Sequence, residues 1–339
     1  MEISFAHGGD VKSFAKELNC FSEEVIDLSS NINFIKPDID IDFNKLDISS
    51  YPSYDELYLC ISKLYNVELN QLELFNGGSS AIFSLFRTFD TKHCYIYSPA
   101  YLEYKKAAIK FDYTIDYINR FVEIEKDVLP NSLVVFVNPS TPDGTFYDID
   151  KLMKMWIEKN CTILIDESFL DFTSFKSVTK YLDSYDKLYI LKSLTKFYSS
   201  AGIRLGTIIS SKNNIEKLKE FEPMWKISQF DQEYIKSVTK DKNFVKISKA
   251  INIRNKELLI DILNKSKYIS HILPSSANYV LVQLKNINAN EFQELLKPYK
   301  IMIRDCSNFD FLDDSFIRVA VKSEKYLNKL KIALENIKK

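Results

Sequence analysis

Short, continuous apolar segments recur along the first two thirds of the chain, and segments with helical spacing lie between them. The apolar segments are rich in β-branched and aromatic residues, as is typical of strands buried on both faces. They are residues 72–75, 94–97, 133–137, 162–165 and 187–191, with helical patterns at 81–86 and 149–159 among them. This alternation predicts an α/β fold with a mostly parallel sheet, whose ligands bind at the carboxyl ends of the strands.

The pattern changes after about residue 225. Long polar helical segments are followed by three further strand-like segments, at residues 279–283, 301–304 and 316–321. We therefore expect a smaller α+β domain behind the large one, which the length of 339 residues also favours.

Composition excludes several classes of protein. The chain is 46% apolar and 27% charged with a net charge of −1, which gives no general attraction to nucleic acid or anionic membranes. No segment has the length and apolarity of a membrane span and the first residues do not resemble a secretion signal, so we expect a cytoplasmic protein. The five cysteines are scattered without C-x-x-C spacing and the three histidines are far apart, so we expect reduced thiols and no metal site.

Glycine is scarce, and its positions are therefore informative. The seven glycines fall in four places: Gly8-Gly9, Gly77-Gly78, Gly144, and the pair Gly202 and Gly206. Glycine is favoured where the backbone needs a positive φ or approaches another group closely. We expect Gly202 and Gly206 to let the backbone turn Arg204 toward a ligand.

Two of the predicted strands end in loops with candidate binding groups. Residues 76–80 (NGGSS) lie between a strand and a helix, where free backbone N–H groups hold phosphate, although a plain tight turn fits as well. Residues 138–144 (NPSTPDG) form a rigid loop that begins with Asn138.

Two further strand ends carry charged groups. Asp166 and Glu167 follow the strand at 162–165, and burial would be costly unless at least one met a cation, a metal or a protonated heterocycle; Asp166 as a helix N-cap is the simpler alternative. In the segment 193–206 (SLTKFYSSAGIRLG), Lys196 is a candidate nucleophile toward a carbonyl, and Ser193 and Arg204 are candidates to bind an anion. An isolated lysine is more often simply solvated.

Together these groups suit one ligand: an aldehyde on a ring with a basic nitrogen and a phosphate. Pyridoxal 5′-phosphate has this chemistry, and proteins bind it with a Schiff-base lysine and an acid opposite the pyridine nitrogen.

These motifs resemble those of the fold type I pyridoxal-phosphate enzymes, in particular the histidinol-phosphate aminotransferases and threonine-phosphate decarboxylases. The resemblance covers essentially the whole chain, and its main segments are 193–206, 138–144, DESFLDF at 166–172, NGGSSAI at 76–82, PAYLEY at 99–104 and Tyr51-Pro52. It implies the aspartate aminotransferase fold. It also implies an amino-terminal arm (1–34) on the small domain and active site, a large cofactor-binding domain (35–225) and a small domain (226–339).

The resemblance also implies a role for each motif residue. Lys196 would form the Schiff base and Asp166 would meet the pyridine nitrogen, while Asn138 would bond the ring hydroxyl and Tyr101 would stack on the ring. The phosphate would be held by Gly78, Ser79, Ser193 and Arg204. Tyr51 would reach it from the neighbouring subunit, which implies a homodimer with shared active sites. Core packing is the alternative role for Tyr51 and Tyr101, since the chain has 20 tyrosines.

Further features resemble the threonine-phosphate decarboxylases of cobalamin synthesis. These are His7-Gly8-Gly9-Asp10, residues 30–33 (SNIN), Phe169 in place of the tyrosine usual in the aminotransferases, and residues 303–309 (IRDCSNF). Two segments depart from the family pattern: FNGGSS at 75–80, and Phe34 where proline is usual.

The resemblance implies decarboxylation of L-threonine O-3-phosphate to (R)-1-amino-2-propanol O-2-phosphate. Arg318 would bind the substrate carboxylate, and Arg304, His7 and Asn33 its phosphate. The alternative is an aminotransferase of the histidinol-phosphate type. A non-catalytic sensor with this fold is disfavoured because the motifs are intact.

Overall fold

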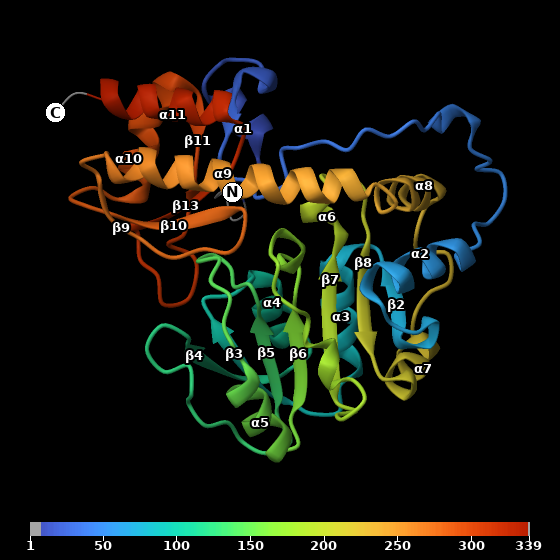
Figure 1. The fold of residues 1–339 in the computed structure, drawn as a ribbon. Helices are drawn as coiled ribbons and strands as arrows, with labels where there is room; N and C mark the ends of the chain where they lie inside the picture. Colours follow the sequence, from blue (N-terminus) through green and yellow to red (C-terminus); the bar gives the residue numbers. More distant parts are fainter. Residues whose placement is uncertain (1–7, 338–339) are drawn as a thin grey trace.

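The computed structural model, which describes residues 8–337, has a central sheet of seven strands in the order β2-β8-β7-β6-β5-β3-β4 (Figure 1). In chain order the strands are β2 (Leu72–Phe75), β3 (His93–Ser98), β4 (Thr114–Asn119), β5 (Leu133–Val137), β6 (Thr162–Asp166), β7 (Leu188–Ser193) and β8 (Gly206–Ser210). All neighbouring strands are parallel except β8, which is antiparallel to β2 and β7. The predicted α/β fold with a mostly parallel sheet is confirmed.

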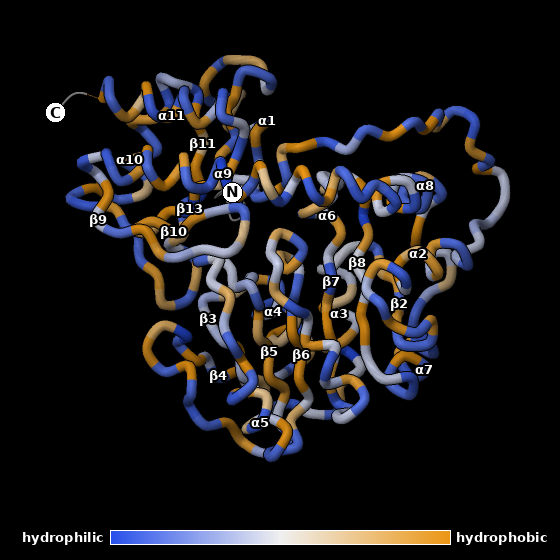
Figure 2. The backbone as a smooth tube through the Cα atoms, viewed as in Figure 1, coloured by the Kyte–Doolittle hydropathy of each residue, from blue (hydrophilic) through white to orange (hydrophobic). Residues whose placement is uncertain are grey.

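Helices pack on both faces of this sheet because its inner strands are apolar on both sides. In β5, Val134 and Phe136 belong to the core on one face, while Leu133, Val135 and Val137 belong to the core on the other. The first core includes α2 (Asp55–Tyr65), α5 (Asp150–Glu158), α6 (Leu194–Phe197) and α8 (Gln229–Val238). The second includes α3 (Gly77–Thr88), α4 (Leu102–Lys110) and α7 (Lys212–Glu220). Figure 2 colours β5 and β6 as largely hydrophobic, as strands covered on both faces require.

The carboxy-terminal part of the chain forms a separate antiparallel sheet. Its strand order is β12-β13-β10-β9, with β9 (Ile269–Ile272), β10 (Tyr279–Leu284), β12 (Arg304–Asp305) and β13 (Phe316–Ala320). Its helices are α9 (Lys242–Asn264), α10 (Ala289–Leu296) and α11 (Glu324–Asn336). Helix α9 extends from this sheet across the central domain toward α8 (Figure 1).

The beginning of the described chain packs on this second part. Strand β1 (Ile26–Asp27) pairs in parallel with β11 (Ile301–Met302). Helix α1 (Val11–Glu17) contributes Phe14 to a small apolar cluster that also contains Met302. The domain boundaries at residues 34 and 225 stay predictions.

One strand prediction differs from the structure, and some strands were not predicted. Residues 301–304 were expected to form one strand, but they divide between two sheets, because the N–H of Ile303 donates to Gln293 Oε1 (2.9 Å) between the two pairings. Strand β4, at the sheet edge, is largely polar and was not predicted. Neither was β8, which begins at a glycine.

Glycine is required at Gly206 by a close approach of two backbones. A Cβ atom at Gly206 would lie 2.8 Å from the N atom of Gly78 and 2.9 Å from the C atom of Gly77. At Gly202, by contrast, a Cβ would meet nothing within 4 Å and the backbone has no positive φ. The expectation for Gly202 is therefore wrong, and the expected close approach is found at Gly206, where β8 meets the start of α3.

Replacing these two glycines should have different effects on stability. Gly206→Ala should lower the free energy of unfolding by about 1–3 kcal/mol, because the added methyl group forces two backbones apart. Gly202→Ala should lie within about 0.5 kcal/mol of the wild type or be slightly more stable. Urea denaturation measures both, and equal midpoints for the two variants would contradict this account.

Candidate active site

A cavity of about 200 Å³ lies at the carboxyl ends of β6 and β7, between the central sheet and the second sheet. Nine of the residues predicted from the sequence line it: Gly78, Ser79, Tyr101, Asp166, Ser193, Lys196, Arg204, Arg304 and Arg318. Their convergence follows from the topology. Parallel strands end at one edge of the sheet, and the antiparallel β8 begins at that same edge, two residues after Arg204.

The start of α3 forms one end of the cavity. Asn76 occupies the N-cap position, but its side chain does not cap the helix, so the N–H groups of the first turn point outward without a side-chain acceptor from Asn76. The guanidinium of Arg204 lies against Gly77, where a Cβ would be 2.7 Å from Arg204 Nη2. Ser79 Oγ lies 3.2 Å from the hydroxyl of Tyr101. A helix N-terminus beside an arginine is suited to bind a phosphate.

Asp166 is the carboxylate of the cavity, and three donors fix its orientation. Tyr104 Oη donates to Oδ2 (2.7 Å), while the N–H and Oγ of Ser168 donate to Oδ1 at 2.9 and 2.5 Å. Burial raises the pKa of Asp166 above its ordinary value, and these hydrogen bonds oppose the rise. A buried carboxylate of this kind gains most from a cation placed opposite it.

Lys196 lies on α6, directly after β7. Burial, with Arg318 and Arg204 nearby, lowers the pKa of its ammonium group to about 8. The backbone of α6 is held by Asn33, whose N–H donates to Lys196 O (3.0 Å) and whose side chain donates to Phe197 O (2.8 Å). Lys196 is therefore a positioned amine with a large neutral fraction near pH 8, as a nucleophile requires.

Arg304 and Arg318 lie directly opposite each other on the antiparallel strands β12 and β13. Arg318 donates to Thr141 Oγ1 (3.2 Å) and to Ser29 O (3.1 Å), and its buried Nε has no hydrogen-bond partner among residues 8–337. Arg304 donates to Asn308 Oδ1 (2.7 Å). Like charges directly opposite each other repel, so this arrangement favours an anion between them.

Three predicted residues among those that the structure describes do not line the cavity. Asn138 is buried, and its side-chain amide exchanges two hydrogen bonds of 3.0 Å with the backbone of Tyr147. The backbone and side chain of Asn33 instead donate hydrogen bonds to carbonyl oxygens of α6. Tyr51 is 76% exposed and stacks on Trp225, with a ring-centroid distance of 4.1 Å. His7 lies outside the described residues.

Thr141, Asn31 and Tyr104 are among the residues at the site that sequence reasoning did not select. Thr141 lines the cavity in the loop from which Asn138 was chosen, and Asn31 lines it two residues before Asn33. Tyr104 reaches Asp166 from α4. Thr141 belongs to the motif NPSTPDG and Asn31 to the motif SNIN. Both motifs were recognised in the sequence, but in each a different residue was chosen as the one facing the cavity.

No three His, Cys, Asp or Glu side chains within residues 8–337 form a group that could hold a metal ion. Among the helices described, none combines the length and apolarity needed to cross a membrane.

The fold and the site together define a class of protein: the fold type I pyridoxal-phosphate enzymes, with a buried aspartate at the end of one strand and a lysine after the next. Residues 25–337 match the model of the aminotransferase class I and II family. The chain belongs to this family, whose members depend on pyridoxal 5′-phosphate.

Three individual proteins show the range within the family. The chain is 28% identical to the adenosylcobalamin biosynthesis bifunctional protein CobDQ of Leptospira interrogans, over 98% of this chain and 41% of that protein, so it spans less than half of that relative. The histidinol-phosphate aminotransferase of Clostridium acetobutylicum is 30% identical, with a TM-score of 0.78 over 86% of this chain and 91% of the other. The L-threonine-O-3-phosphate decarboxylase of Porphyromonas gingivalis is 22% identical, with a TM-score of 0.79 over 97% and 96%, and shows the shared fold.

The lowered pKa of Lys196 predicts an unusual rate of chemical modification. In the protein without ligands, the rate of acylation of Lys196 should rise with pH and reach half its maximum near pH 8, because only the neutral amine reacts. Peptide mass mapping of a pH series measures the rate, with the exposed Lys212 as the control. A half-maximal rate at pH 10 or above for Lys196 would contradict the prediction.

Proposed function

We propose that this protein decarboxylates L-threonine O-3-phosphate to (R)-1-amino-2-propanol O-2-phosphate with pyridoxal 5′-phosphate as cofactor. The observation that carries the proposal is the charge of the cavity, whose lining holds one carboxylate, Asp166, and four cationic side chains: Lys196, Arg204, Arg304 and Arg318. Such a lining suits ligands that together carry several negative charges. The cofactor phosphate and the substrate's phosphate and carboxylate are three such groups.

The residues of the cavity fit the cofactor. Gly78, Ser79, Ser193 and Arg204 would hold its phosphate, and Tyr101 would stack on its ring. Asp166 would face the ring nitrogen, and Lys196 would bind the aldehyde carbon. The residue at the ring hydroxyl is the one revision: Thr141 lines the cavity and Asn138 does not, so we propose Thr141 for this contact.

Bound pyridoxal 5′-phosphate withdraws electrons from the Cα atom of an attached amino acid, which weakens the bonds around that atom. Asp166 would support this by holding a proton at the ring nitrogen, since a buried carboxylate is stabilised by a cation opposite it. Lys196 would be the residue that moves a proton at Cα. With a pKa of about 8, its ammonium group can return a proton to Cα after CO₂ has left.

The paired arginines would hold the substrate. Arg318, with its unpartnered Nε, would bind the carboxylate, and Arg304 the phosphate, with Asn31 beside them and with His7 predicted to assist. The bond that breaks is the one held perpendicular to the cofactor ring. The position in which Arg318 would hold the carboxylate therefore helps to determine whether decarboxylation or transamination follows.

The alternative is an aminotransferase of the histidinol-phosphate type, which the 30% identity to the Clostridium acetobutylicum protein favours. Histidinol phosphate carries a phosphate but no carboxylate. In the half-reaction with histidinol phosphate, one of the two opposed arginines would have no anion, and for this reason we place the aminotransferase second.

We also propose a homodimer in which Tyr51 reaches the cofactor phosphate of the neighbouring subunit. Tyr51 lies outside the cavity of its own chain and exposes 76% of its surface. Two other apolar residues nearby are also exposed: Ile48, close to Tyr51 in the sequence, and Met224, next to the stacking partner Trp225. An interface would bury these apolar groups.

The cofactor assignment predicts a spectroscopic signature. Purified protein supplied with pyridoxal 5′-phosphate should show the visible absorption band of covalently held cofactor, and Lys196→Ala should abolish the band. Lys212→Ala, at an exposed lysine on α7, is the control and should keep it. If the wild-type protein shows no such band, the proposed function fails.

The reaction assignment predicts release of CO₂ from L-threonine O-3-phosphate. Arg318→Met should lower kcat/KM by about 100-fold or more, because loss of a buried charge-paired contact costs roughly 2–5 kcal/mol. The matched assay is glutamate formation from histidinol phosphate and 2-oxoglutarate. Activity in the second assay alone would replace our first proposal with the alternative.

A further inference from the structure

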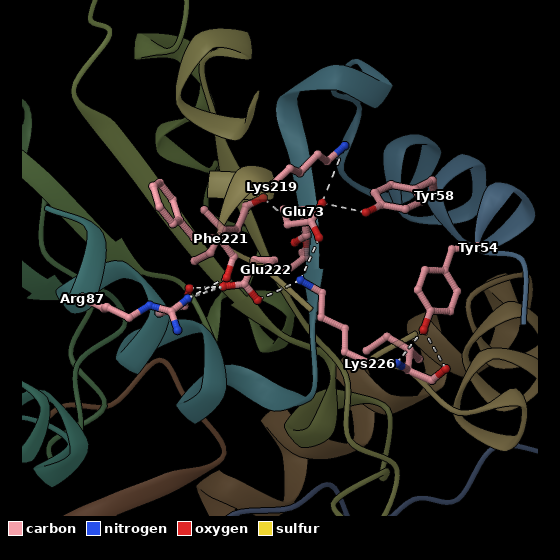
Figure 3. A network of polar contacts seen from close by, with 12 residues as sticks. Tyr54, Tyr58, Glu73, Arg87, Lys219, Phe221, Glu222 and Lys226 are labelled. Carbon is pink, nitrogen blue, oxygen red and sulfur yellow. Dashed lines mark hydrogen bonds and ion pairs between the residues drawn. The ribbon is translucent and has the colours of Figure 1, made fainter. Parts of the chain in front are cut away.

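A buried ionic network outside the cavity joins β2 and α3 to a following segment of the chain (Figure 3). Lys226 Nζ lies 2.8 Å from Glu73 Oε1 and 3.0 Å from Glu222 Oε2, and the three side chains are at most 9% exposed. Glu73 belongs to β2, while Glu222 and Lys226 belong to the segment 221–227 between α7 and α8. Two buried carboxylates thus share one buried ammonium group.

The network ties the segment 221–227 to β2 and along α3. Glu222 accepts from Ser84 Oγ and from Arg87 Nη2, and Arg87 also donates to Phe221 O (2.9 Å). At the other end, Asn76 Nδ2 donates to Lys226 O (3.3 Å). Asn76 is the N-cap residue of α3, immediately before Gly77, so the contacts reach from the helix start to its last turn.

The same segment supports the loop that carries Tyr51. Tyr54 Oη accepts from the N–H of Ile227 (2.8 Å) and donates to Ile227 O (3.1 Å). Tyr51 stacks on Trp225, whose backbone has a positive φ of 51°. Glu73 also accepts from Tyr58 Oη (2.6 Å). One short segment therefore contacts both the start of α3 and the Tyr51 loop.

The charges of this network are costly for a purely structural contact. Removing two carboxylates and an ammonium from water is compensated only when the geometry is good, and apolar side chains of similar volume often stabilise a protein as well or better. In some proteins buried ionic groups are kept because they fix the geometry of the segments that they join, and we assign that role to this network. That geometry matters here because both joined elements are predicted to contact a cofactor phosphate.

We propose that Glu73, Lys226 and Glu222 are positioning residues that set the start of α3 at one cofactor phosphate and Tyr51 at the phosphate of the neighbouring site. The inference rests on the proposed function, since it assigns the phosphate to α3 and Tyr51. None of the three residues lines the cavity, so they act through the elements they hold.

The test compares the affinity for pyridoxal 5′-phosphate with that for pyridoxal, which lacks the phosphate. Lys226→Met should weaken binding of pyridoxal 5′-phosphate about tenfold, by analogy with the loss seen when residues that orient metal ligands are mutated. Binding of pyridoxal, which has no phosphate to contact α3 or Tyr51, should change much less. Lys219→Met is the matched control: Lys219 Nζ lies 3.6 Å from Glu73 but is 42% exposed, so both affinities should stay at the wild-type values.

A second readout needs no cofactor. The chain has two tryptophans, Trp156 and Trp225, and Trp225→Phe identifies the fluorescence that comes from Trp225. In Lys226→Met the Trp225 emission should shift toward that of a water-exposed indole, because the support of its segment is lost. If Lys226→Met does not fold, Glu222→Gln replaces it in the test, because this variant keeps the contact of Lys226 with Glu73. It should show a smaller loss of affinity for pyridoxal 5′-phosphate and a smaller shift of the Trp225 emission.

The outcomes separate this inference from the proposed function. Equal losses of affinity for the two ligands, or no loss for either, would overturn the positioning role while leaving the proposed function intact. An unchanged Trp225 emission in a folded Lys226→Met protein would also overturn it. If the wild-type protein fails to bind pyridoxal 5′-phosphate, the proposed function fails first, and the positioning role at the phosphate fails with it.

Discussion

Three arginines and a lysine share one cavity with a single carboxylate, and the chemistry of the site follows from this excess of positive charge. Arg204 and Arg318 help to lower the pKa of Lys196 to about 8, which makes its amine available as a nucleophile. Asp166 is oriented by Tyr104 and Ser168 and is buried deeply enough to favour a cation opposite it. The positive charge of the cavity therefore has two effects: it lowers the pKa of Lys196 and it favours the binding of anions.

Buried ion pairs behind the site hold the elements that supply these groups. Glu167 follows Asp166 and Lys192 precedes Ser193, and their side chains meet at 2.5 Å on the side of the strand ends away from the cavity. Glu167 also accepts from Ser177 Oγ and from the N–H of Val178. Because neighbouring residues of a strand point to opposite faces, one strand end carries a site residue on one side and a structural ion pair on the other. The expectation that one of the two adjacent carboxylates meets a cation is met by Glu167.

Much of the fold could be predicted because buried parallel strands are apolar on both faces. Strands β2, β5 and β10 were found almost to the residue by this criterion. It fails for β4, where one face is polar at the sheet edge, and for residues 301–304, whose pattern suits a strand but whose backbone pairs with two different partners. Pairing partners depend on distant segments, so a local pattern does not contain them.

The sequence by itself determined the chemistry of the site: the residues that follow each strand end, their charges, and the family to which their motifs belong. Only the tertiary structure decided which member of each motif faces the cavity. Asn138 turns to the backbone of Tyr147 while Thr141 lines the site, and Asn33 holds α6 while Asn31 lines it. The physical reason is that the direction of a side chain in a loop depends on the hydrogen bonds that the loop makes with distant segments. The meeting of Arg304 with Arg318, and of Glu73 with Lys226, likewise depends on packing between elements far apart in the chain.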